Sequence, residues 1–101
     1  MITFGFDPEM VVSPKSRWKL VKLVFNNRET PQGYSIAIGE WDGSHELVMR
    51  WNGGEKQPKG HPIVRGLPTW FVIPQKFRKA IIHELDLSSD DLKFCKCFLS
   101  F

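Results

Sequence analysis

The residues of this chain best suited to chemistry are an indole ring and several basic side chains in its central part. Trp41 offers a flat apolar ring, and Arg50, Lys56, Lys59 and Arg65 follow it. This combination is typical of binding to single-stranded nucleic acid, because bases stack on aromatic rings while cations neutralise the phosphates. The plainer interpretation of each cation is a solvated surface residue.

Enzyme chemistry has less support in the sequence. His45, His61 and His83 are expected on a hairpin tip, a loop and a helix, so they do not converge as metal ligands. No phosphate-binding glycine loop or nucleophilic serine motif is present. Cys95 and Cys97 are too close for an unstrained disulfide and too few to hold zinc, so free thiols are expected. We predict no enzyme, and hence no catalytic residue, metal or cofactor.

A β-hairpin must position Trp41. Asp42-Gly43 is the strongest short hairpin signal that a sequence offers, because a type I′ turn needs positive φ at both central positions. The turn fixes the register of two strands, residues 34–41 and 44–51, so that Trp41 faces Ser44.

This register separates the two faces of the hairpin. One face is apolar and is expected to form core: Tyr34, Ile36, Ile38, Leu47, Met49 and Trp51. The other face has mostly small side chains, with Trp41 at one end and Arg50 at the other. Because so few large side chains cover it, we expect this face to be the open binding surface. The alternative is that the tail, residues 92–101, or a second subunit covers it.

The other segments predict an α+β fold: a curved, mainly antiparallel sheet of four or five strands with one C-terminal amphipathic helix packed on it. Residues 18–25 and 69–73 form further strands, and 18–25 packs either on both faces or only through alternate residues. The helix covers 75–85, because Pro74 suits a first turn and an apolar stripe with four-residue spacing follows.

A chain of 101 residues is expected to form one domain spanning 1–101, with 1–16 irregular and 92–101 an apolar tail or last strand. The net charge is +3, and basic residues concentrate in 15–28 and 50–79, which suits a polyanionic partner. No stretch approaches the ~20 apolar residues of a membrane span, and no signal-peptide pattern is present. We therefore expect a cytoplasmic protein without a membrane partner.

The order of four strands and one helix resembles the single-stranded-DNA-binding transcriptional coactivator family known as positive cofactor four. The segments that carry the resemblance are residues 35–43, 48–51, 59–60 and 71–77. Residues 61–68 are extra relative to the family pattern, and Trp51 lies one residue closer to Arg50 than that pattern implies.

The resemblance implies a homodimer packed through the helix, whose curved sheets bind two strands of DNA. Carried over to this chain, it nominates Trp41, Arg50 and Lys59 as nucleic-acid contacts, and Phe77 as part of the dimer or core contact. We expect Ile81, one helical turn further on, to join Phe77 in the dimer contact.

We therefore predict sequence-tolerant binding of single-stranded DNA or RNA by a dimeric sheet surface. Trp41 would stack a base, Arg50 and Lys59 would neutralise phosphates, and Lys56 and Arg65 would clamp the strand. The main alternative is a small dimeric module that binds a protein or an apolar ligand. A small ribonuclease that uses a histidine of the basic loop, His61, is a third candidate.

Overall fold

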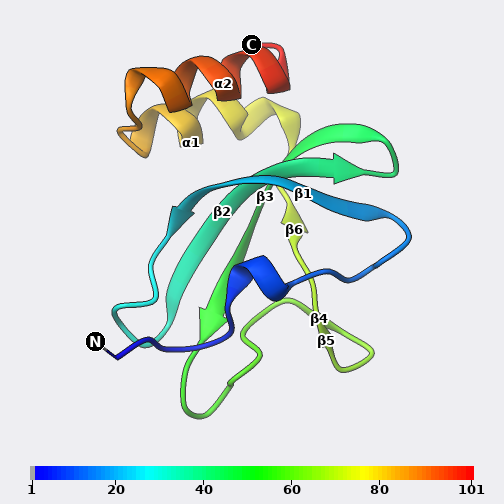
Figure 1. Cartoon of the computed structure of the whole chain (residues 1–101), viewed down its shortest axis with the longest axis vertical. Coiled ribbons are helices and arrows are strands. Elements are labelled where there is room, and N and C mark those ends of the chain that lie inside the picture. The colour runs from blue at the N-terminus through cyan, green and yellow to red at the C-terminus, as the bar shows by residue number, and fades with distance from the viewer. Residues whose placement is uncertain (1) are drawn as a thin grey trace.

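An antiparallel sheet of four strands in the order β1-β2-β3-β6 forms the middle layer of the protein (Figure 1). The computed structural model describes residues 2–101. The predicted fold class, α+β with a mainly antiparallel sheet, is confirmed. The elements in chain order are η1 (Pro8–Met10), β1 (Trp18–Asn26), β2 (Gly33–Trp41), β3 (Ser44–Gly53), β4 (Ile63–Val64), β5 (Leu67–Pro68), β6 (Phe71–Val72), η2 (Gln75–Phe77), α1 (Arg78–Glu84) and α2 (Ser89–Leu99). Here η denotes a 3₁₀ turn, and β4 pairs only with β5.

The hairpin of β2 and β3 has the predicted register. Trp41 pairs with Ser44 at the turn, and Tyr34 pairs with Trp51 at the far end. Asp42 has a φ of 53° and Gly43 a φ of 83°, as a type I′ turn requires. Local turn chemistry alone therefore determines how these two strands meet.

Two helices, α1 and α2, cover one face of the sheet (Figure 1). The buried core between the sheet and the helices consists of Ile36, Ile38, Leu47, Ile73, Ile82, Cys95 and Leu99. The helix predicted over 75–85 is present as η2 followed by α1.

The segment expected as a tail or last strand is helical instead, because most of it lies in α2. Ser88 begins this helix, and its Oγ accepts a hydrogen bond of 3.2 Å from the backbone N–H of Asp91. Cys95 and Leu99, four residues apart, are buried against the sheet. The segment therefore completes the core of its own chain.

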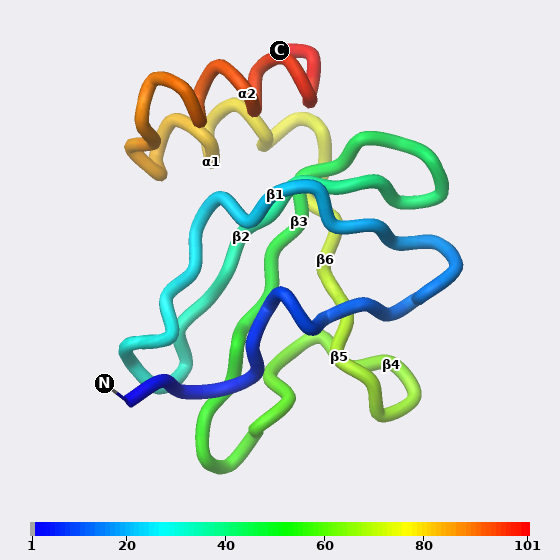
Figure 2. Tube along the Cα trace, in the orientation of Figure 1, coloured from blue at the N-terminus to red at the C-terminus, as the bar shows by residue number. Residues whose placement is uncertain are grey.

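The second face of the sheet is also covered, which corrects the prediction of an open surface. Ala37 and Val48 are fully buried on this face beneath Val11, Trp18 and Trp70. The N-terminal segment crosses the sheet here (Figure 2), where Trp70 Nε1 donates a hydrogen bond of 3.3 Å to the Val11 carbonyl. The chain's own N-terminal segment and rings, rather than the tail or a second subunit, form this cover.

The small side chains expected to leave this face open are what allow large rings to approach it. A Cβ atom on Gly39 would lie 2.4 Å from a ring carbon of Trp18, so only glycine fits beneath that indole. The N-terminal segment was predicted to be irregular, but it contains the 3₁₀ turn η1 and a buried residue, Val11.

Strand β1 contributes to both cores, because two register shifts change its side-chain alternation. The shifts lie between Leu20 and Lys22 and between Leu23 and Phe25. Leu20 and Leu23 therefore pack against the core that contains Trp18 and Trp70, whereas Phe25 packs on the helix side of the sheet. This outcome confirms the alternative in which the strand has apolar contacts on both faces.

Candidate nucleic-acid interface

Two hollows adjoin at the β6 edge of the sheet, and we call them together the edge groove. The larger hollow, about 450 Å³, is lined by residues that include Arg17, Trp41, Val64 and Trp70. The smaller hollow, about 320 Å³, is lined by Met49, Arg50, Trp51 and His61. Both hollows also include Pro62 and Phe71 in their walls, so they meet at these two residues.

Two exposed aromatic rings lie along the edge groove. Phe71 is 55% exposed and Trp51 is 49% exposed, and because both line the same hollow they form an apolar patch rather than isolated surface residues. Strand pairing fixes the backbone beneath both rings, since Phe71 pairs with Met49 and Trp51 pairs with Tyr34, whose ring it meets edge-on at 5.8 Å. The groove therefore presents rigid aromatic surfaces of the kind on which bases stack.

The uncovered position of Trp51 follows from where the helices lie. Arg78 of α1 pairs with the Glu46 carboxylate and Phe98 of α2 stacks on His45, so both helices contact β3 near the hairpin turn. Figure 1 shows them at that end of the sheet, and the other end of the strand pair lies bare. Trp51 was predicted in the core from the alternation along its strand, which does not show how far along the strand the helices extend.

Trp41 lies at the other end of the groove and is half-buried. Its ring packs against that of Trp18 with 5.8 Å between centroids, and the Arg17 guanidinium lies 5.9 Å from the Trp41 ring centroid. Arg17 also donates two hydrogen bonds to the Asp42 carboxylate, from Nε at 2.8 Å and from Nη2 at 2.7 Å. These hydrogen bonds lower the pKa of Asp42 and raise that of Arg17, so both stay charged at neutral pH.

Arg50 does not contact solvent, which corrects its assignment as a phosphate contact. Its side chain is 1% exposed, and its guanidinium donates to the carbonyl oxygens of Thr69, at 2.5 Å, and of Lys59. Burial lowers the pKa of Arg50 to about 10, so the group remains charged at neutral pH. The residue instead joins the 54–62 loop to the segment that leads into β6.

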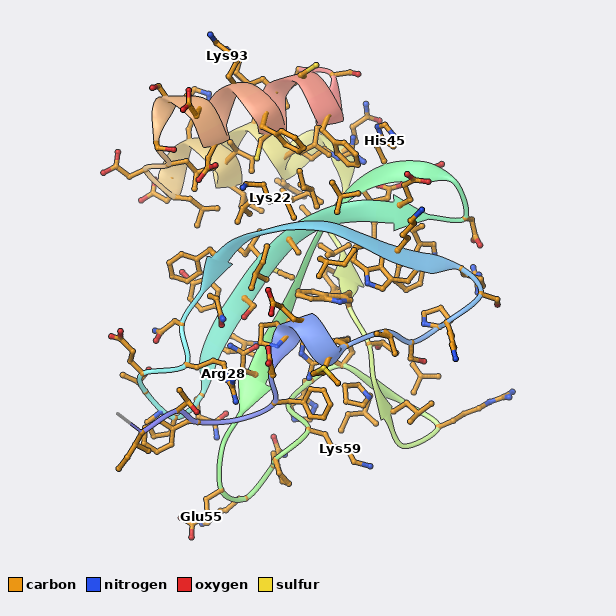
Figure 3. All side chains as sticks on the ribbon, in the orientation of Figure 1. Lys22, Arg28, His45, Glu55, Lys59 and Lys93 are labelled. Carbon is orange, nitrogen blue, oxygen red and sulfur yellow. The ribbon has the colours of Figure 1, made fainter. Side chains whose placement is uncertain are left out.

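The other predicted cations are exposed, and they lie beside the edge groove rather than in its wall. Lys59 Nζ donates a hydrogen bond of 2.7 Å to the Gly66 carbonyl, and Arg65 forms the tip of the β4–β5 hairpin. Lys56 is exposed on the loop that precedes them. Figure 3 shows Lys59 on the same loop as Glu55, at the end of the molecule away from the helices.

The histidines and cysteines have separate surroundings. His45 stacks on Phe98 with 3.9 Å between centroids, whereas His61 Nε2 lies 2.5 Å from the side-chain oxygen of Gln57. Both cysteines are free thiols, and burial raises the pKa of Cys95. Across residues 2–101 no three His, Cys, Asp or Glu side chains are grouped as a metal site. Nor, within the same range, is any helix long and apolar enough to cross a bilayer.

The two predicted dimer residues differ in exposure. Phe77 in η2 is 51% exposed, whereas Ile81 in α1 is partly buried against the helix-side core. Ile81 also borders a hollow of about 230 Å³ that it shares with Tyr34, Met49 and Leu85. An apolar surface therefore continues from α1 onto the bare end of the sheet.

The sequence-predicted site and the edge groove overlap only in part. Trp41 lines the groove, as does Arg17, which the sequence analysis counted among the basic residues without assigning it to the site. Phe71 was expected on a strand, and its exposure at an edge could not be inferred before the strand order was known.

The resemblance to the coactivator family rests on the short motifs quoted above. It stays a prediction, since none of the three comparisons made with known proteins supports or opposes it. No family model matches the chain, and neither a curated protein nor a solved structure matches it.

Proposed function

We propose that the protein binds single-stranded nucleic acid along the edge groove, without strong sequence preference. The observation that carries this proposal is that Trp51, Phe71 and Trp41 line two hollows that meet at Phe71. Every base has a π-face, so stacking on such rings favours no particular sequence. Hydrogen-bonding groups that could read base edges are few in these walls, which are mainly aromatic and aliphatic.

The charge distribution supports a polyanion in this place. Arg17 lines the larger hollow, and Arg65 follows Val64, which lines the same hollow. Lys59 lies two residues before His61 in the wall of the smaller hollow. A strand stacked in the groove would therefore have cations within reach of its phosphates, and its affinity would fall as salt rises.

Phe71→Ala and Trp51→Ala test the stacking role. We expect each substitution to lower the affinity for labelled oligo-dT roughly tenfold, because stacking contributes about 1–3 kcal/mol per base. Fluorescence anisotropy titrations at several salt concentrations give both the affinity and its salt dependence. We expect a log–log slope of about −2 if three cations contact phosphates.

Phe94→Ala is the matched control for these variants. Phe94 is 45% exposed, but it belongs to α2 and stacks on Phe98 at 6.3 Å, away from the groove. Its removal should leave oligonucleotide affinity unchanged. Equal binding by wild type, Phe71→Ala and Trp51→Ala, or no binding by any of them, would contradict the proposal.

We also propose that two copies associate through the apolar surface formed by Phe77, Ile81 and the bare end of the sheet. This surface includes exposed rings and a hollow large enough for a partner's side chain. Burying it would compensate for the limited core of a chain of 101 residues.

A module that binds an apolar or protein ligand is the second candidate, because the same groove walls are largely apolar. Binding that is insensitive to salt, with no affinity for oligonucleotides, would favour it. A ribonuclease that uses His61 has less support, because Arg50, the other ionisable residue of that hollow, is hydrogen-bonded to two carbonyls. An RNA cleavage assay on wild type and His61→Ala tests this third candidate.

A further inference from the structure

Arg17 is an exposed cation in the wall of the larger hollow, and its guanidinium is already paired with the carboxylate of Asp42. Building on the proposed function, we infer that Arg17 is a phosphate-binding residue of the edge groove and that Asp42 restrains it until a nucleic acid displaces the carboxylate.

The backbone places Arg17 independently of its ion pair. The carbonyl of Arg17 accepts a hydrogen bond of 2.8 Å from the backbone N–H of Asp42, and the next residue, Trp18, pairs with Trp41 in the sheet. The backbone therefore keeps Arg17 next to Trp41 after the carboxylate is lost, with the ring, 5.9 Å from its guanidinium, still within reach. A base on that ring would bring its phosphate within reach of the guanidinium.

Exchange of the carboxylate for a phosphate is feasible because the ion pair is open to water. The side chains of Arg17 and Asp42 are 55% and 51% exposed. Ion pairs this exposed contribute little to stability, so little opposes their separation. A phosphate offers the same two-oxygen geometry to the guanidinium and carries charge that the fork of Arg17 recognises well.

The carboxylate would make the groove selective. A polyanion that only supplies charge must compete with Asp42 for Arg17, whereas a nucleic-acid strand adds stacking on Trp41, Phe71 and Trp51. Asp42 stays ionised well into the acid range, because the hydrogen bonds from Arg17 lower its pKa. The restraint should therefore have the same strength from pH 6 to pH 8.

Asp42→Asn tests the restraint with little risk to the fold. Asn-Gly is at least as favourable as Asp-Gly in a type I′ turn, so the hairpin should persist. We expect this variant to bind labelled oligo-dT roughly two- to fivefold more tightly than wild type, since Arg17 no longer has a charged competitor and an ion pair this exposed is worth at most about 1 kcal/mol. Arg17→Gln should bind roughly tenfold more weakly, and its log–log salt slope should be smaller by about 0.7.

Glu40→Gln is the matched control, because it removes one negative charge near the same hairpin end. Glu40 makes no salt bridge among residues 2–101. The tighter binding of Asp42→Asn should also vanish in the double variant with Arg17→Gln. The inference is overturned if Glu40→Gln tightens binding as much as Asp42→Asn, or if the gain survives without Arg17.

These outcomes are separate from failure of the proposed function. If wild type binds oligonucleotides and Phe71→Ala weakens that binding, but the Arg17 and Asp42 variants match wild type, only the restraint is wrong. If neither wild type nor Asp42→Asn binds oligonucleotides, both the proposed function and the restraint are wrong.

Discussion

Arg50 holds a positive charge inside the protein and joins segments that are distant in sequence. Its guanidinium donates to the carbonyl of Lys59, in the loop that follows β3, and to that of Thr69, two residues before β6. Gly60 makes room for this arrangement: its φ is +65°, and a Cβ there would lie 2.8 Å from Nη2 of Arg50. Satisfying these two carbonyls, one buried and one part-buried, is the role that the structure gives to this cation.

Arg50→Met should lower the free energy of unfolding by about 2 kcal/mol. Each carbonyl left without a donor costs about 1–3 kcal/mol, and loss of a buried charge offsets part of that cost. Urea denaturation followed by circular dichroism measures the change. Arg50→Lys should fall between wild type and Arg50→Met, because one ammonium group cannot replace the planar fork.

A phosphate contact at Arg50 would give a different result. Arg50→Met would then unfold at the wild-type urea concentration, while the salt slope of oligonucleotide binding would become smaller by about 0.7. That pair of observations would overturn the structural role assigned to this residue.

Among the elements, α2 depends most visibly on its first turn. Ser88 caps the helix through its bond to Asp91, and two acidic residues, Asp90 and Asp91, lie where the helix dipole favours negative charge. The helix in turn places Cys95 and Leu99 in the core.

Ser88→Ala should destabilise the protein by about 1 kcal/mol, because one N–H of the first turn loses its partner. Thermal denaturation should show a decrease of roughly 4–8 °C for a domain of this size. Ser88→Asp is the control: aspartate caps as well as serine, so that variant should match wild type. If Ser88→Asp destabilises the protein as much as Ser88→Ala does, the Ser88 hydroxyl has a role other than capping.

How far each element could be predicted depended on how local its causes are. The β2–β3 register was predicted residue by residue, since Asp42-Gly43 fixes it. Helix α2 was missed because Lys93 and Lys96 obscured its period, although both are exposed on the finished helix. The covered second face was missed because Val11 and Trp70, which meet there, lie far apart in the sequence.

The candidate site, too, could be predicted only where a local pattern determines it. Trp41 was predicted from its place beside the turn, and the structure puts it in the edge groove. The burial of Arg50 depends on the path of the excursion between β3 and β6, which no local pattern specifies. Arg17 and Phe71 join Trp41 only through tertiary structure, so sequence spacing could not bring them together.

At the scale of the whole molecule, both faces of the sheet are occupied, and apolar hollows lie at its β6 edge and its bare end. A nucleic-acid strand and a second copy would each need part of this surface. The edge groove adjoins the proposed dimer surface, because Met49 lines both the smaller hollow of the groove and the hollow beside Ile81.

Phe77→Asp should therefore convert the proposed dimer to monomers, because a charge would be buried in the proposed interface. Light scattering after size-exclusion chromatography measures the mass directly. Phe94→Asp, which adds the same charge on α2, should leave the dimer intact. A wild-type protein that is monomeric at every concentration would contradict the proposed dimer.

The two register shifts in β1 have a consequence for how the protein behaves at high concentration. This strand has nine residues and lies at an edge of the sheet, where a long, flat, apolar ladder could recruit further chains into fibrils. Two interruptions within nine residues bend the strand, and Lys19 and Lys22 add charge along it. A straight incoming strand would find no continuous ladder to extend, so the irregular spacing that lets β1 reach two cores also guards the molecule against aggregation.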